Sequence, residues 1–269
     1  MSLEDAARTA VEQCMGLEAG ESCVVVTDDK REAIGEALYD AANDVTDDVV
    51  VARFPPGDQH GEEPPAPVAA AMASADVFLA PTSKSLSHTR ARGDANDAGA
   101  RGATLPGITE SVFTTGLDAD YDAIQRHCLD VLEQVADAEE VRVTSPQGTD
   151  VTVRPGSREW LSDTGNVTDP GAFSNLPAGE VFVSPESAEG RYVVDGTMMP
   201  HGLLDEDQTL SFEVEDGQVT DISDDDVREQ VETAADEVGD AAYNLAELGI
   251  GTNVAVTDLV GSEIGRASC

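Results

Sequence analysis

Ser22-Cys23-Val24-Val25-Val26-Thr27 encloses an apolar run rich in β-branched residues, and this stretch decides the fold expected for the first half of the chain. A short continuous run of this kind predicts a strand that is buried on both faces of a sheet. The following segments favour a helix over residues 31–42 and a second strand over residues 48–54. Because strands that alternate with helices usually pair in parallel, we expect a parallel sheet covered on both faces.

The alternation of strands and helices continues to about residue 138. Further strands are expected over residues 76–81 and 102–107, and a strongly amphipathic helix over residues 121–138. Residues 1–138 are therefore predicted to form a doubly wound α/β domain with a parallel sheet. The first strand is followed by Asp28-Asp29-Lys30 instead of a glycine-rich turn, which disfavours a dinucleotide-binding role.

Residues 139–269 carry a different pattern, in which hairpins replace the alternation of strand and helix. Two strands are expected to flank a Pro/Gly turn within residues 140–154, and Asp216-Gly217 marks a second hairpin. A long helix is expected over residues 225–248, ending at Gly249. We therefore predict an α+β mixed-sheet domain over residues 139–269.

Acidic residues dominate the composition, with 54 Asp and Glu against 15 Lys and Arg and a formal net charge of −39. Lys occurs at positions 30 and 84 alone, and the acidic residues are spread through every segment. Such a surface is typical of a protein that stays soluble in concentrated salt, where screening weakens its self-repulsion. We expect a halophilic, acidic, cytoplasmic protein that binds neither nucleic acid nor membranes, because phosphate backbones and anionic lipids would be repelled.

The cysteines show no metal-binding or redox spacing. Cys14, Cys23, Cys128 and Cys269 form no C-x-x-C motif, so free thiols in a reducing compartment are expected. No apolar run in the sequence approaches the roughly 20 residues that a membrane-spanning helix needs, and no signal peptide opens the chain.

A turn formed by Pro177, Ala178 and Gly179 precedes Glu180, which is the first residue of the apolar run Val181-Phe182-Val183. Gly and Pro mark the turn, and β-branched and aromatic residues mark the strand. A carboxylate at the mouth of a strand is either solvated or held by a cation, and this segment alone leaves both readings open.

Glu247 is expected in the last turn of the predicted long helix, followed by Gly249 and Gly251. The helix dipole disfavours a negative charge at that end, and a nearby cation would remove the penalty. The glycines would allow another group to approach the backbone closely. The alternative is a solvated carboxylate before a glycine that ends the helix.

Two motifs resemble the metalloaminopeptidase family of aminopeptidase T and aminopeptidase S. They are Asn175-Leu-Pro-Ala-Gly-Glu-Val-Phe-Val-Ser-Pro185 and Ala246-Glu-Leu-Gly-Ile-Gly-Thr-Asn253, within a similarity over about residues 75–263. The resemblance implies that the α+β domain over residues 139–269 is of the catalytic type and carries the metal site. In that site Glu180 and Glu247 would ligate a centre of two divalent metal ions, with zinc as the default and cobalt or manganese as substitutes. It also implies a homodimer in which a metal-activated water removes N-terminal residues from a peptide substrate.

The later ligands of that family, two His, one Tyr and one Asp, have no counterpart here, because no His follows His201. After Ile264 the sequence reads Gly265-Arg-Ala-Ser-Cys269, so we expect a chain that is truncated or frame-shifted at its C-terminus. Carboxylates without imidazole bind transition metals weakly, so little or no peptidase activity is expected. His201, in a Pro-His-Gly turn, is a possible auxiliary ligand, although such turns are more often exposed loop.

Two other functions stay open at this point. The dihydroxypyridine dioxygenases look like relatives of the fold expected here, so a mononuclear iron ring-cleaving dioxygenase is the alternative enzyme. A non-catalytic remnant or binding protein is the alternative outside enzymes, and it predicts no stoichiometric metal. Two zinc-like ions would support the peptidase, whereas one ferrous ion with oxygen uptake would support the dioxygenase.

Overall fold

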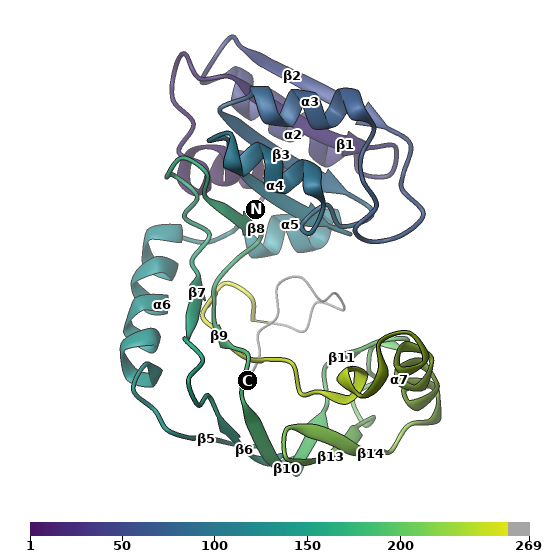
Figure 1. The fold of residues 1–269 in the computed structure, drawn as a ribbon. Coiled ribbons are helices and arrows are strands. Elements are labelled where there is room, and N and C mark those ends of the chain that lie inside the picture. Colours follow the sequence, from purple (N-terminus) through teal and green to yellow (C-terminus); the bar gives the residue numbers. More distant parts are fainter. Residues whose placement is uncertain (258–269) are drawn as a thin grey trace. The chain divides into compact units, whose positions relative to one another are not determined.

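The computed structural model describes residues 1–257 of the 269-residue chain (Figure 1). Internal contacts divide these residues into two compact units. Unit 1 comprises Met1–Arg126, Asp163–Gly179 and Asn253–Thr257, and unit 2 comprises His127–Ser162 and Glu180–Thr252. Each unit is interrupted in sequence by the other, and the expected domains over residues 1–138 and 139–269 stay a prediction.

Unit 1 is built on a five-stranded parallel sheet in the order β2-β1-β3-β4-β8. Its strands are β1 Cys23–Asp28, β2 Val49–Phe54, β3 Val77–Thr82, β4 Arg101–Pro106 and β8 Phe173–Asn175. Every residue of β1 and β3 is buried, as expected for strands covered on both faces. The sheet confirms the α/β fold predicted from the alternation of strands and helices.

Helices cover both faces of this sheet (Figure 1). They are α1 Leu3–Arg8, the π-helix η1 Thr9–Cys14, α2 Glu32–Asn43, α3 Ala66–Ser74, α4 Arg90–Asp97, α5 Glu110–Gly116 and α6 Tyr121–Val135, of which α6 continues into unit 2. Val24 and Phe78 of the sheet share one core cluster with Met72 of α3 and Ala95 of α4. α2 packs on β1 and contacts α1. Within residues 1–257, none of the helices has the length and apolar character that crossing a membrane requires.

The carboxyl ends of the parallel strands meet at one edge of the sheet, where the strand order reverses between β1 and β3. Asp28 ends β1 and is 1% exposed. Its carboxylate accepts hydrogen bonds from Ser83 N at 2.5 Å, Ser83 Oγ at 3.0 Å and Lys30 N at 2.9 Å, which join the loops after β1 and β3. Open α/β sheets bind their ligands outside the carboxyl ends of the strands at such a reversal.

The described cysteines are buried thiols. They are Cys14, Cys23 and Cys128, as the lack of C-x-x-C spacing predicts, whereas Cys269 lies outside the described residues. Burial raises the pKa of the Cys23 thiol to about 12 and also raises the pKa of Cys14. Both side chains therefore stay protonated at neutral pH and serve as core residues.

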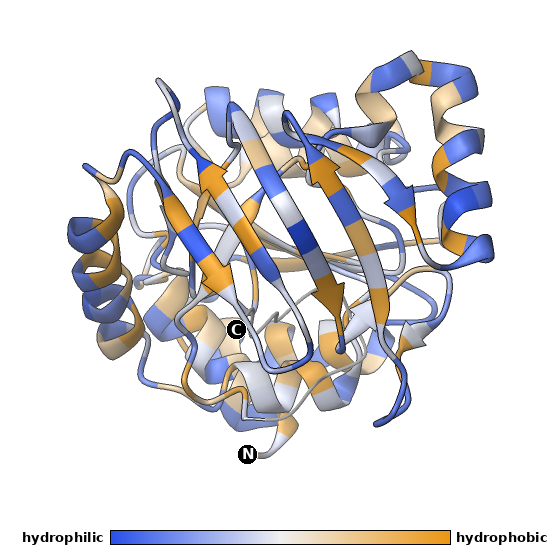
Figure 2. Cartoon of the chain, turned by 90° about the horizontal axis from the view of Figure 1, so that it is seen from below, coloured by the Kyte–Doolittle hydropathy of each residue, from blue (hydrophilic) through white to orange (hydrophobic). Residues whose placement is uncertain are grey.

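Unit 2 contains a five-stranded antiparallel sheet in the order β14-β13-β10-β6-β5. Its strands are β5 Val141–Thr144, β6 Asp150–Arg154, β10 Ser187–Val194, β13 Leu210–Glu215 and β14 Gln218–Ile222. Along β6 and β13 more buried and more exposed residues alternate, and Figure 2 shows hydrophobic and hydrophilic residues alternating along the strands of this sheet. α7 Asp225–Val238 packs Val227 into the cluster of Phe212 and Ile222, which confirms the mixed α+β character expected for this part.

Two smaller sheets complete unit 2. One has the order β15-β9-β7, with β7 Leu161–Asp163, β9 Glu180–Val183 and β15 Leu248–Gly251. The other pairs β11 Thr197–Met198 with β12 Gly202–Leu203. The residues that the sequence predicts as metal ligands lie on or beside these short strands. Glu180 opens β9, Glu247 directly precedes β15, and His201 lies in the turn between β11 and β12.

The helix expected over residues 225–248 is shorter in the structure. α7 ends at Val238, because Gly239 takes a φ of +71° and turns the backbone out of the helix. A 3₁₀-helix, η2 Gly239–Tyr243, follows, and residues 248–251 form β15 instead of a last helical turn. The prediction that Glu247 sits at a helix C-terminus is therefore wrong, and the helix dipole does not act on it.

The packing of Phe78 against Gly102 gives a test of the core of unit 1. These residues are paired across β3 and β4, and a Cβ at Gly102 would overlap the Phe78 ring. Gly102→Ala is expected to lower the free energy of unfolding by about 1–3 kcal/mol through overpacking. Gly93→Ala, in α4 with open space around it, is the control and is expected to stabilise by about 0.5–1 kcal/mol. Denaturant unfolding at one fixed KCl concentration measures both, and equal midpoints for the two variants would contradict the close packing.

Candidate functional site

Glu180 is positioned by a glycine turn and a strand pair. Gly179 has a φ of +126°, which glycine adopts without strain, and Glu180 then opens β9. β9 pairs with β15 in antiparallel register, with Gly251 opposite Glu180. The Glu180 residue is half-buried in this arrangement.

Glu247 lies directly before β15, the strand that pairs with the strand of Glu180. The Glu180 side chain lies against the backbone of Gly249 in β15. A Cβ added at Gly249 would overlap Glu180 Oε1, so this position needs glycine. Glu247 lies two residues before Gly249 and outside β15, so the register of the two strands does not fix the direction of its side chain. Glu247 is exposed, and no third His, Cys, Asp or Glu among residues 1–257 completes a ligand cluster with the pair.

Cys128 of α6 anchors this strand pair. Its Sγ lies 2.9 Å from Thr252 Oγ1, directly after β15, and 3.9 Å from the carbonyl oxygen of Glu180. Cys128 and Thr252 are buried, at 0% and 2% exposed. The position of the Glu180 backbone therefore depends on packing against α6.

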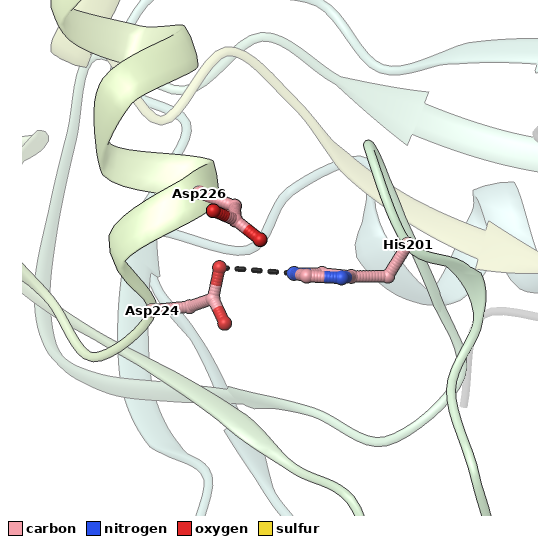
Figure 3. Close-up of side chains that lie close together, drawn as sticks. All are labelled: His201, Asp224 and Asp226. Atoms are coloured by element: carbon pink, nitrogen blue, oxygen red, sulfur yellow. Dashed lines mark hydrogen bonds and ion pairs between the residues drawn. The ribbon is translucent and has the colours of Figure 1, made fainter.

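A second group of possible metal ligands forms around His201, which the sequence predicts as an auxiliary ligand (Figure 3). His201 lies in the turn between β11 and β12, and Asp224 and Asp226 lie at the start of α7. His201 Nε2 is 2.9 Å from Asp224 Oδ1, and one ligand atom from each of the three residues lies within 4.8 Å of the others. One imidazole nitrogen and two carboxylate oxygens could hold a divalent metal ion. The structure thus groups His201 with two aspartates and not with Glu180 and Glu247.

Asp224 also has a structural role in this group. Its carboxylate caps α7 by accepting a hydrogen bond from Val227 N at 3.0 Å. The hydrogen bond from His201, followed by the backbone bond of the cap, lowers the pKa of Asp224. Asp224 is therefore ionised at neutral pH, and it can hold the β11–β12 turn on α7 either directly through His201 or through a shared cation.

An acidic groove of about 650 Å³ runs along α7 beside these three residues. Pro200, next to His201, and Asp226 line it, together with Glu229 and Glu237 farther along the helix. Carboxylates along a groove raise the local concentration of cations. An ion from solvent can therefore reach Asp226.

Sequence reasoning does not single out Asp224 and Asp226. An acidic run before an amphipathic helix is the ordinary pattern of a helix start, and Asp224 serves as that cap. Asp224 is 23 positions from His201, and the β13–β14 hairpin lies between them in the chain. The sequence shows a Pro-His-Gly turn upstream of an Asp-rich helix start, and this pattern does not indicate how close His201 lies to the two aspartates.

Comparisons with known proteins identify the family. A family model described as NicX, 2,5-dihydroxypyridine 5,6-dioxygenase, matches residues 2–257. The structure of the 2,5-dihydroxypyridine dioxygenase from Pseudomonas putida KT2440 is similar with a TM-score of 0.74 and 18% identity, over 92% of this chain and 76% of that chain. Wild-type AmpT from Thermus thermophilus is similar with a TM-score of 0.65 and 18% identity, over 96% of this chain and 80% of that chain. No curated protein sequence matches.

The family match indicates that the protein is an enzyme. The chain belongs to the NicX family, described as 2,5-dihydroxypyridine 5,6-dioxygenase. The assignment to the metalloaminopeptidases of the aminopeptidase T and aminopeptidase S type is therefore wrong, and so are the aminopeptidase, protease and hydrolase functions drawn from it. At 18% identity the similarity to AmpT shows the fold alone. The homodimer, the partners and the cytoplasmic location stay predictions.

The described residues do not fit the metal site of a non-haem iron oxygenase, which uses two His and one carboxylate. The group around His201 offers one His and two carboxylates, and Glu180 with Glu247 offer no imidazole. No step of ring cleavage is therefore assigned to an iron ion. The donors present suit a divalent ion held chiefly by carboxylate oxygens.

Metal binding by the group around His201 can be tested directly. His201→Ala and Asp226→Asn are each expected to weaken Zn²⁺ binding by about tenfold or more, because each removes one of three ligands. Asp236→Asn, also on α7 and exposed, is the matched control and should bind as the wild type does. Isothermal titration calorimetry at constant pH and KCl concentration measures the affinities. An unchanged affinity in His201→Ala would show that His201 contacts α7 without binding metal.

Proposed function

We propose that this protein is a ring-cleaving dioxygenase that acts on a dihydroxylated pyridine ring. The observation that carries the proposal is the family match over residues 2–257. The fold shared with the Pseudomonas putida dioxygenase, at a TM-score of 0.74, supports it. The alternative enzyme anticipated from the sequence thus replaces the peptidase.

The reaction class sets what the protein must accommodate. A 5,6-dioxygenase places both atoms of O₂ on the ring carbons whose bond is broken, so the aromatic substrate and O₂ combine in equal amounts. The electron-rich ring supplies the electrons that reduce O₂, and no external reductant enters the balance. The protein must therefore bind a small planar ring with two hydroxyl groups and admit O₂ to it.

We propose that Glu180, the first residue of β9, and Glu247, directly before β15, are carboxylate ligands of a divalent ion, and no step of ring cleavage is assigned to that ion. The proposal is supported by the pairing of the two strands and by the position of Glu180 against Gly249. If the two carboxylates approach each other, a cation between them removes the cost of their repulsion. Two divalent ions, with zinc, cobalt or manganese as the candidates, are what the sequence suggests for these ligands.

Oxygen uptake tests the proposed activity. Purified protein supplied with ferrous ion is expected to consume O₂ and 2,5-dihydroxypyridine in equal amounts. Loss of the aromatic ring removes its near-ultraviolet absorbance, so an oxygen electrode and a spectrophotometer follow the same reaction. Heat-denatured protein with the same ferrous ion is the control for autoxidation. Ring loss no faster than in that control, across a range of KCl concentrations, would refute the proposed activity.

Glu180→Gln tests the proposed ligand role separately from turnover. The change keeps the size of the side chain and removes its charge, so Mn²⁺ binding is expected to weaken by about tenfold or more. Glu232→Gln, on the exposed part of α7, is the matched control. Electron paramagnetic resonance of free Mn²⁺ measures binding without any assay of activity. Normal binding in Glu180→Gln, combined with lost binding in His201→Ala, would move the metal site to the group around His201.

A further inference from the structure

Basic side chains are scarce in this protein, and most of the described arginines form ion pairs with carboxylates. Within residues 1–257, the basic side chains that form no ion pair are Lys30, Arg31, Lys84, Arg92 and Arg158. The chain has 54 acidic residues against 15 basic ones, so potential partners are abundant. A cation that stays without a carboxylate therefore has to be kept apart by the fold.

All of these cations except Arg158 lie at the carboxyl edge of the parallel sheet in unit 1. Lys30 and Arg31 follow β1, and Lys84 follows β3. Arg92 lies in α4 but is already engaged, because it donates to Ser87 O at 2.8 Å and stacks on Phe173. Both lysines of the chain are therefore at the point where the strand order reverses. We call Lys30, Arg31 and Lys84 the cationic edge.

Three of the carboxylates near the cationic edge, those of Asp28, Asp29 and Glu32, have other partners. Asp29 and Glu32 both pair with Arg53 at the end of β2. The carboxylate of Asp28 is turned inward and accepts hydrogen bonds from Ser83 and from the backbone of Lys30. Glu110 is the acidic residue that lines the same hollow as Lys30 and Arg31.

The hollow beside Lys30 and Arg31 has a volume of about 240 Å³ and is also lined by Ile34, Ile108 and Thr109. Arg31 Nη2 donates to Gly107 O at 3.1 Å, which joins the loops after β1 and β4. Arg31 Nε is buried and has no hydrogen-bond partner among the described residues. A buried donor without an acceptor is rare in proteins and favours the arrival of an acceptor atom.

We propose that the cationic edge binds a small anion that carries a phosphate or carboxylate group. Lys30 and Arg31 supply charge on one side of the strand-order reversal, and Lys84 supplies it on the other, held in place by the bond from Ser83 to Asp28. Ile34 and Ile108 offer an apolar wall for a short carbon chain. The volume of about 240 Å³ is enough for a small organic acid or a phosphate monoester. This site is independent of the ring-cleaving activity.

Anion titration tests the proposal. Inorganic phosphate and succinate serve as probes, because they separate phosphate from carboxylate recognition. One equivalent of at least one probe is expected to bind the wild-type protein in isothermal titration calorimetry at constant pH and ionic strength. Lys30→Gln and Lys84→Gln are each expected to weaken that binding by about tenfold, the effect of one lost charge-assisted contact. The side chains of both lysines make no hydrogen bond among the described residues, so these variants are expected to stay folded, which circular dichroism checks.

Arg158→Gln is the matched control. Arg158 is exposed, forms no ion pair and belongs to unit 2, so its loss removes the same charge from another place. It is expected to bind the probe within about twofold of the wild type, because exposed charges at a distance are screened. Absence of saturable binding of either probe would overturn the proposal, and so would an equal loss of affinity in Arg158→Gln and Lys84→Gln.

Discussion

The buried carboxylate of Asp28 is the constraint on which the carboxyl edge of the parallel sheet depends. It ends the interior strand β1 at 1% exposure, and a buried polar group is tolerated when hydrogen bonds replace those it would make with water. Ser83 supplies two of these bonds and the backbone of Lys30 supplies a third. The loops after β1 and β3 are thereby fixed to each other, and so are the positions from which Lys30 and Lys84 extend.

The fold and the chemistry of this protein are separate inferences. A dioxygenase and AmpT both match the chain at 18% identity, so the fold by itself does not distinguish ring cleavage from other reactions. The motifs that resemble a metalloaminopeptidase serve the fold: Gly179 provides the turn before β9, and Gly249 makes room for Glu180. Such glycines are needed wherever these two strands pair in this way. The wrong family assignment follows because a dioxygenase and AmpT share this fold, so motifs of the shared fold do not distinguish one reaction from another.

The elements with strong local signals could be predicted from the sequence. The run around Val25 becomes a fully buried strand, and Asp216-Gly217 forms the expected tight turn with φ angles of +51° and +80°. β8 could not be predicted, because three residues carry little periodicity and its partner β4 lies far upstream. For the same reason the distance between His201 and Asp224 could not be predicted, since it depends on the folding of the hairpin between them. Local sequence patterns predict helices and strands. The groups of site residues form through contacts between residues that are far apart in the sequence, which local patterns do not show.

The cationic edge is unusual because the rest of the protein is strongly acidic. With a formal net charge of −39, the protein repels anions over most of its surface, and an anion approaching at random is turned away. Cations that the fold keeps without carboxylate partners then form a local region where an anion is favoured. Arg101 shows the opposite arrangement, because its buried guanidinium is fully used by Glu21 and by two backbone carbonyls. Arg101 therefore stabilises the structure, whereas the side chains of Lys30 and Lys84 stay available to a ligand.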